Sequence, residues 1–581
     1  MPLKRTVHAF FGTNQVEKIF FINAPIVTVI IGEMLWNPDD ILGPTHANMM
    51  SCFEDRADDT EELKGSEGHH RYSVTVKNSL QFRLSVDYLR VGLSFRQAAR
   101  VLQATKERSG LASIGSCSVT TVARYTRICC AVNLQNISDL LERAWTFSIA
   151  MDMSTHLSTS YLDVRIRLHL IEHGIINFHV LAIPVYGRHT ASVIFNTASK
   201  ALDVLYPKWK DVIIGISTDG ERKMTGHVSG VATRFQQVAK PGFIRIWCGA
   251  HQLDLVLQNS YSMFADDSFY TNLTALISYL RRQQNLISEM QSKAPTVADT
   301  RWESMDSVAR WFKKNKVKLD EYLVAKKPNC SPAPAWWLQL LVISNFAACA
   351  TVTFKGLQGH SVTVSMQRNH LAYLQTVFLR TVGGGGPLTE FEAASLDNPL
   401  WVLSECRRFS ASLVKVKEFI MNLGSFADAK LQQMDEENIE KLVKDVAILY
   451  VRAVGGISGI VAERDAANDC DQLLPPALPH QLVTISRSDL CCIIRTHRER
   501  LAAAGWSTMD MDIVEEEHET LLDAYMREPA FRSAISACDD GTDFTDAWSA
   551  VKGRFKALHR FCGGLASVFP EQVKWKAIFR C

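Results

Sequence analysis

The sequence has no uninterrupted apolar run long enough to cross a bilayer. Its most apolar stretch, residues 19–31, contains Asn23 and Pro25 and falls short of the roughly 20 residues that a membrane helix needs. It also starts too late for a secretory signal and is followed by no small-residue cleavage site. We therefore expect a buried strand or helix there, no membrane-spanning segment and no membrane partner.

Cysteines at the spacing of a zinc finger or a redox motif are also missing. The fourteen cysteines are spread from Cys52 to Cys581, and none forms a Cys-x-x-Cys pair. This distribution is typical of reduced thiols in a nuclear or cytoplasmic protein. Cys52, His69 and His70 are too few and too badly spaced for a zinc site, so we expect no structural zinc.

Neither sign of charge is in excess. The 581 residues contain 63 Lys and Arg against 61 Asp and Glu, for a net charge of +2, which excludes a uniformly basic coat. Hydrophobic residues make up 47% and charged residues 21%, as in folded globular proteins. The length is enough for three or four domains, so any surface for nucleic acid must be local.

The balance is uneven along the chain. Residues 54–67 hold seven acids against two bases and have the composition of a linker. Residues 77–130 hold nine bases against two acids, for a local charge of +7. The bases are Lys77, Arg83, Arg90, Arg96, Arg100, Lys106, Arg108, Arg124 and Arg127.

The basic stretch has the pattern of three helices. Residues 82–89 are apolar at helical spacing, Gly92 can end the helix, and Ser94 with Gln97 forms a capping box for a second. A third helix over residues 119–130 places Arg124 and Arg127 on one face. Together with Arg96 and Arg100 this face could lie on DNA phosphates; the alternative is an ordinary helical subdomain with a solvated basic side.

A region of strands follows. Residues 146–151 form a short apolar run closed by Asp152, residues 164–170 alternate apolar and polar, and residues 178–185 return as a third strand. We expect the alternating strand to be half-buried. A helix over residues 190–205, a strand over 212–216 ending near Asp219, a helix over 225–238 and a strand over 243–247 complete the pattern.

Two acids therefore fall at the ends of strands. If the first and fourth strands are neighbours, Asp152 and Asp219 emerge together and offer oxygen ligands to divalent cations. Such an arrangement suits two-metal phosphoryl transfer. The alternative is that both aspartates have only turn roles.

Helix-like periodicity dominates from about residue 252 to 560, interrupted by Pro- and Gly-rich loops. We accordingly expect an N-terminal segment with the acidic linker (1–70), a basic helical domain (71–143), the first part of the core (144–258), a helical insertion (259–550) and an incomplete remainder of the core (551–581).

Four motifs occur in order along this region. They are Asp152-Met-Ser-Thr-His, Ser217-Thr218-Asp219-Gly220, Cys248-x-x-His251-x-Leu253 and Thr300-Arg301-Trp302-Glu303. Together they resemble the hAT superfamily of DNA transposases, over roughly residues 80–310 and only in outline beyond. The resemblance implies an α/β ribonuclease-H-like core with a mixed five-stranded sheet, three antiparallel then two parallel strands, interrupted by a large all-α insertion and preceded by an N-terminal helical domain.

The resemblance also implies roles for the motif residues. Asp152 and Asp219 would be the first two catalytic carboxylates, binding Mg²⁺ or Mn²⁺. Cys248 and His251 would lie beside the active site, with His251 near a phosphate. In the insertion, Trp302 would stack on a base and Arg301 would pair with phosphate. The alternatives are a core thiol, a satisfied histidine and a core aromatic residue.

The end of the chain departs from the family pattern. The family's third acid is a glutamate in a Ser-rich segment near the C-terminus, and a dimerisation helix follows it. Here the only acid of the tail, Glu571, comes directly after Pro570, outside that motif, so its role as third ligand is the weakest of these predictions.

We therefore expect a nuclear, or alternatively cytoplasmic, DNA-binding protein with impaired strand transfer. A homo-oligomer stays open, although the pattern does not include the family's dimerisation region. Two other functions remain open: an active transposase, and a helical protein-interaction scaffold with a vestigial core.

Overall fold

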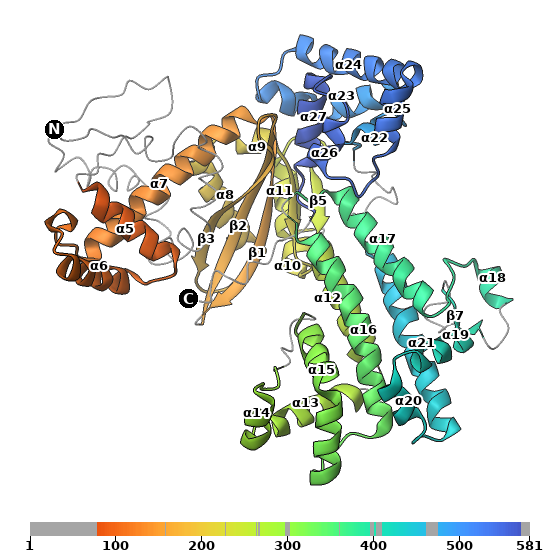
Figure 1. The fold of residues 1–581 in the computed structure, drawn as a ribbon. Coiled ribbons are helices and arrows are strands. Elements are labelled where there is room, and N and C mark those ends of the chain that lie inside the picture. The colour runs from red at the N-terminus through yellow and green to blue at the C-terminus, as the bar shows by residue number, and fades with distance from the viewer. Residues whose placement is uncertain are drawn as a thin grey trace. The chain divides into compact units, whose positions relative to one another are not determined.

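The computed structural model describes residues 78–156, 158–226, 228–262, 264, 268–296, 303–359, 361–395, 400–401, 409–460 and 475–570. The chain forms two compact units (Figure 1). The first, which we call the sheet unit, comprises Met1–Trp247 and Glu463–Cys581, and the second, the helical unit, comprises Cys248–Ala462. The insertion therefore starts and ends earlier than the range 259–550 that we expected from the sequence.

The sheet unit is built on five strands in the order β3-β2-β1-β4-β5. β1 (Phe147–His156), β2 (Thr159–Leu170) and β3 (Gly174–Val185) are antiparallel neighbours. β4 (Ile213–Thr218) and β5 (Ile244–Trp247) continue the sheet in parallel with β1. This confirms the predicted mixed five-stranded sheet. The first strand is longer than expected, however, so that Asp152 lies within it and not at its end.

Helices connect the parallel strands. α8 (Ala191–Leu205) is capped by Thr190, whose side chain accepts a hydrogen bond from the Val193 amide; α9 (Trp209–Val212) leads into β4. The single helix expected over residues 225–238 is two helices, α10 (Arg222–Thr225) and α11 (Val231–Val238). The reason is a tight turn in which the Gly230 amide donates to the Gly226 carbonyl at 2.9 Å. A Cβ on either glycine would lie within 2.6 Å of backbone atoms.

Both faces of the sheet are buried, so the prediction of a half-buried second strand is wrong. On one face, side chains such as Phe147, Ile149 and Val164 pack with α8 and α11. On the other, the polar residues Arg167 and His169 are only 1% and 5% exposed. That face is covered by α26 (Phe544–Ser549) and α27 (Lys556–Ala566), which come from the far end of the chain.

The C-terminal helices of the sheet unit are held by long-range contacts. Ser148 in β1 donates to the Ser567 carbonyl at 2.5 Å and accepts from the Phe569 amide at 3.0 Å. Buried Arg500 donates to the carbonyls of Ile213 and Lys240 at 3.1 and 3.0 Å. The Arg500 contacts show that the chain has rejoined the sheet before residue 550. The other helices here are α22 (Pro479–Leu482), α23 (Arg487–Ala503), α24 (Thr508–Arg527) and α25 (Pro529–Ser536).

Three helices precede the sheet: α5 (Ser79–Arg90), α6 (Phe95–Ser109) and α7 (Val119–Arg143). The predicted capping box is confirmed, since Ser94 and Gln97 bond each other's amides at the start of α6. The third helix extends well beyond the expected residue 130. Its first half packs against α5 and α6 through residues such as Val122 and Tyr125, whereas Ile137 and Leu141 belong to the core of the sheet.

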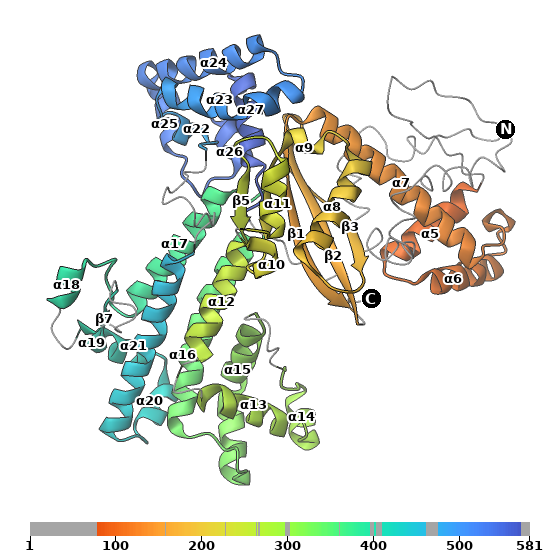
Figure 2. The same ribbon diagram turned by 180° about the vertical axis from the view of Figure 1, so that it is seen from behind.

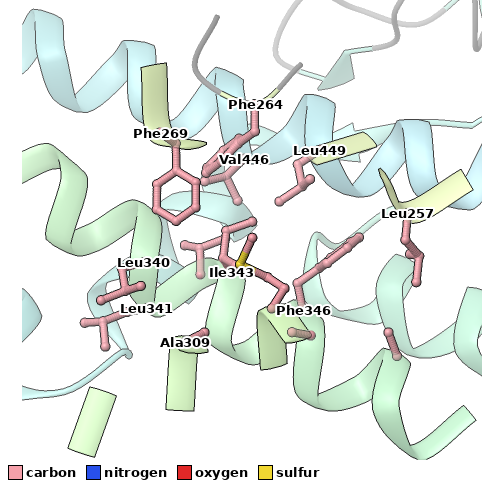
Figure 3. Packing of buried hydrophobic residues seen from close by; sticks show 14 of the residues in the cluster. Leu257, Phe264, Phe269, Ala309, Leu340, Leu341, Ile343, Phe346, Val446 and Leu449 are labelled. Carbon is pink, nitrogen blue, oxygen red and sulfur yellow. The ribbon is translucent and has the colours of Figure 1, made fainter. Parts of the chain in front are cut away.

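The helical unit contains long helices that lie side by side, α12, α16, α17 and α21 (Figure 2). Its core includes Leu257, Phe269, Ile343, Phe346 and Val446 (Figure 3). Its elements are α12 (Gly249–Ser262), α13 (Ser268–Leu280), α14 (Gln284–Met290), α15 (Glu303–Lys326), α16 (Pro334–Leu357), α17 (Val364–Thr381), α18 (Glu390–Ala394), β6 (Leu400–Trp401), β7 (Ala411–Ser412), α19 (Leu413–Met421), α20 (Ser425–Leu431) and α21 (Glu436–Ser458).

One described helix, α16, is long and apolar enough to pass a test for membrane spans by length and composition. We expected no such segment from the sequence. Most of this helix is buried in the helical unit, where Trp337, Leu340 and Phe346 are core residues. The core helix of a folded unit passes the same test, so the length and composition of α16 are weak support for a membrane segment.

Candidate active site

The two predicted carboxylates lie on neighbouring strands. The parallel register of β1 and β4 ends with the pair Met151 and Thr218. The residue that follows each of them in the sequence is an aspartate, Asp152 after Met151 and Asp219 after Thr218. Partners in a parallel register lie about 5 Å apart, so Asp152 and Asp219 each directly follow one member of a neighbouring pair. Both are half-buried, which leaves part of each side chain accessible.

The backbone after Asp219 is held by close packing. The Asp219 carboxylate accepts a hydrogen bond from the Glu221 amide at 3.3 Å, and Gly220 lies beneath the indole of Trp247. A Cβ at position 220 would come within 2.6 Å of the indole nitrogen, so only glycine fits there. Arg245 donates to the Thr225 carbonyl at 2.9 Å and fixes the far side of the same turn.

A third aspartate, which we did not predict, lies in the same row of the sheet. Asp163 on β2 is paired with Asp152 in the antiparallel register. Its carboxylate contacts Arg165 at 2.6 Å and His179 at 2.7 Å. The polar half of the alternation in β2 was the available signal, but we took that face to be solvent-exposed.

The ionisation of Asp163 is set by these contacts. Burial raises the pKa of Asp163, but the charges of His179 and Arg165 and their hydrogen bonds outweigh burial and lower the pKa to about 2. Asp163 is thus a carboxylate with both oxygens engaged by neighbouring side chains. It adds negative charge beside Asp152, and the Arg165 guanidinium balances that charge.

Within the described residues, no group of three or more His, Cys, Asp or Glu side chains has the arrangement of a metal site. Asp152 and Asp219 supply hard oxygen donors of the kind that Mg²⁺ and Mn²⁺ take. Two such carboxylates fit a loosely held metal ion whose remaining coordination positions are filled by water or substrate phosphate.

The other predicted site residues are elsewhere. Cys248 and His251 belong to the helical unit, where Cys248 is 1% exposed and part of the hydrophobic core, as in the core-thiol alternative. Their placement beside the carboxylates therefore stays a prediction. Arg301, Trp302 and Glu571 lie outside the described residues.

The predicted basic surface has its side chains in solvent. Arg96 and Arg100 on α6 and Arg124 and Arg127 on α7 are all exposed. Each pair is separated by three or four residues, so its members share one helix face. The surface can therefore present four positive charges to a polyanion.

The long loop between α6 and α7 is tied to the helices by a residue that we missed. The buried Gln81 amide nitrogen donates to the carbonyls of Ile114 and Ser116 at 2.9 and 3.0 Å. Its oxygen accepts from the Tyr125 hydroxyl at 2.8 Å. These bonds fix the start of α7, so the length of the loop does not loosen the three-helix arrangement.

Comparisons of the chain with models of known protein families and with curated proteins find no match.

Proposed function

We propose that this chain is a transposase-derived DNA-binding protein of the hAT type, with a ribonuclease-H-like core for magnesium-dependent DNA cleavage and strand transfer that works only weakly. The observation that carries the proposal is the register of β1 and β4, whose last pair, Met151 and Thr218, is followed directly by Asp152 and Asp219. The mixed strand order and the exposed arginines of α6 and α7 also support it.

The chemistry follows from the two carboxylates. Asp152 and Asp219 would hold Mg²⁺ or Mn²⁺, which supplies Lewis-acid activation of the attacking oxygen and stabilises the leaving one. The chain itself positions the carboxylates: β1 fixes Asp152, and the packing of Trp247 on Gly220 fixes the turn after Asp219. The basic face of α6 and α7 would bind the phosphate backbone.

Weak activity follows from the number of available ligands. The carboxylate next to Asp152 in the sheet, Asp163, is engaged by Arg165 and His179. A site with two carboxylate ligands holds a divalent cation less firmly than one with three. We therefore propose slow cleavage, not the turnover of an intact transposase.

The test is nicking of supercoiled DNA in the presence of Mg²⁺ or Mn²⁺. We expect slow nicking by the wild type and none by Asp219→Asn, which removes the charge and keeps the shape of the side chain. The control is Asp211→Asn, an exposed aspartate of the same unit that pairs with Lys240 at 3.6 Å. Equal nicking by wild type and Asp219→Asn would exclude catalysis by this site.

A further inference from the structure

The helical unit carries a concentration of positive charge that the proposed function does not use. Residues 281–318 contain nine bases and four acids, for a net charge of +5, although the whole chain has only +2. Most of the bases lie on or near α15. They are Arg281, Arg282, Lys293, Arg301, Arg310, Lys313, Lys314, Lys316 and Lys318.

α15 is fixed by its inner face. Met305, Val308, Phe312, Leu319 and Leu323 are at most 1% exposed and belong to the core of the unit. The opposite side of the helix is therefore held in a constant position toward solvent, so charges on it are presented without an ordering cost for the backbone.

The outer face of α15 carries a ladder of cations. Arg310, Lys314 and Lys318 follow one another at intervals of four residues, so they share one face at steps of roughly 6 Å along the helix axis. Lys313 flanks the ladder and is exposed, as are Arg310 and Lys314.

Part of this charge is balanced and part is not. Arg310 pairs with Asp306, and Lys318 pairs with Glu289 at 2.8 Å. Lys313 and Lys314 have no ion pair within the part of the chain that the structure describes. Part of the unbalanced charge on α15 thus belongs to these two adjacent, exposed lysines.

The groove beside the ladder does not explain the charge. It has a volume of about 570 Å³ and lies between α14 and α15, and its charged lining residues are Glu289, Lys314, Lys318 and Glu321. Two lysines and two glutamates give the groove no net charge. The ridge formed by Arg310, Lys313 and Lys314 is the part that attracts a polyanion.

We propose that this ridge binds the phosphate backbone of DNA, as a second contact surface in addition to the basic face of α6 and α7. Duplex DNA carries one negative charge for about every 1.7 Å of its axis, and neutralising phosphates with lysine releases condensed counterions. Exposed cations on a rigid helix suit this sequence-independent attraction. The inference rests on the proposed function, because it takes DNA as the ligand of the protein.

The test compares full-length variants in a DNA-binding titration. Lys313→Gln/Lys314→Gln removes two charges from the ridge; the matched control, Lys355→Gln/Lys444→Gln, removes two exposed lysines of α16 and α21 in the same unit. Affinity for a mixed-sequence duplex is measured by fluorescence anisotropy between 50 and 200 mM salt. We expect the slope of log affinity against log salt to become shallower by about 1.8 in the ridge variant and to stay unchanged in the control.

The outcomes separate the two proposals. A steep wild-type slope that is unchanged in Lys313→Gln/Lys314→Gln overturns the ridge and leaves the proposed function standing. A wild type that does not bind the duplex at the lowest salt contradicts the proposed function itself. If the ridge variant instead loses binding to poly-glutamate with its DNA slope intact, the surface binds acidic polypeptides and the DNA assignment is wrong.

Discussion

At the scale of single residues, the most unusual feature is a pair of neutral histidines, one on β2 and one on α27. His169 lies in contact with His559, their rings 5.3 Å apart. Burial and the neighbouring His559 lower the pKa of His169 to about 3, and burial lowers the pKa of His559 to about 4. Both side chains are therefore neutral in the folded protein at pH values where they would be protonated in the unfolded chain.

We predict that acidification destabilises the sheet unit through His169. The unfolded chain binds the proton near pH 6.5 and the folded chain only near pH 3. The contribution of His169 to the free energy of unfolding is therefore fully present above pH 6.5 and is lost as the pH falls toward 3. For this residue the loss is about 2 kcal/mol between pH 7.5 and pH 5. Urea unfolding at the two pH values should give a smaller loss for His169→Phe than for the wild type.

The lowered pKa of Asp163 acts in a different window. The contribution of Asp163 to the free energy of unfolding is present above pH 4 and is lost only as the pH falls toward 2. Asp163 therefore does not contribute to the change in stability between pH 7.5 and pH 5. An equal loss of stability in wild type and His169→Phe would assign the acid sensitivity to other groups. The first of these to examine is His497, whose pKa is lowered by burial and by Arg500 to about 3.

At the scale of elements, α27 approaches the sheet closely because it has two adjacent glycines. A Cβ on Gly563 would lie 2.0 Å from the His169 ring, and a Cβ on Gly564 would lie 2.1 Å from the Trp145 indole. Trp145 also stacks on Phe561 at 5.4 Å and donates to the Arg560 carbonyl at 3.0 Å. The small residues allow these contacts.

We predict that Gly563→Ala destabilises the protein, although alanine is intrinsically the better helix former. The added methyl group overpacks the buried His169 ring, which costs about 1–3 kcal/mol and exceeds the gain of about 1 kcal/mol from helix propensity. Thermal unfolding measures the change. Gly459→Ala is the control, since its nearest neighbour is 3.4 Å away; a stabilised Gly563→Ala variant would show that α27 is not closely packed.

Another element joins two regions of the sheet unit. α7 has 25 residues and is about 37 Å long; its first half belongs to the N-terminal helices and its second half to the sheet core. The basic face and the carboxylate pair thus belong to one compact unit, and α7 connects them rigidly.

At the scale of the whole molecule, the small net charge is the sum of large local charges. Residues 77–130 carry +7 and residues 281–318 carry +5, whereas residues 508–546 contain twelve acids and two bases, for −10. DNA would be attracted to the first two regions and repelled by the third.

We predict that Arg124→Gln/Arg127→Gln weakens DNA binding without changing the fold. Two lost phosphate contacts should make the salt slope shallower by about 1.8 and weaken binding to all sequences alike. The matched control is Lys200→Gln/Lys208→Gln, two exposed lysines of the same unit. Equal slopes in both variants would remove α7 from the DNA surface.

The sequence alone determined much of the local structure. The capping box at Ser94 and the strands that contain Asp152 and precede Asp219 were predictable, because caps and apolar periodicity are properties of neighbouring residues. The mixed sheet was implied only by the family resemblance. The tertiary structure decided the rest. The periodicity of β2 indicates one apolar face but cannot tell whether the polar face meets water, since its cover, α27, comes from the far end of the chain. In the same way, the contact of Arg500 with the Ile213 carbonyl, 287 residues away, returns the chain to the sheet before residue 550, and only the pairing of β1 with β2 brings Asp163 beside Asp152.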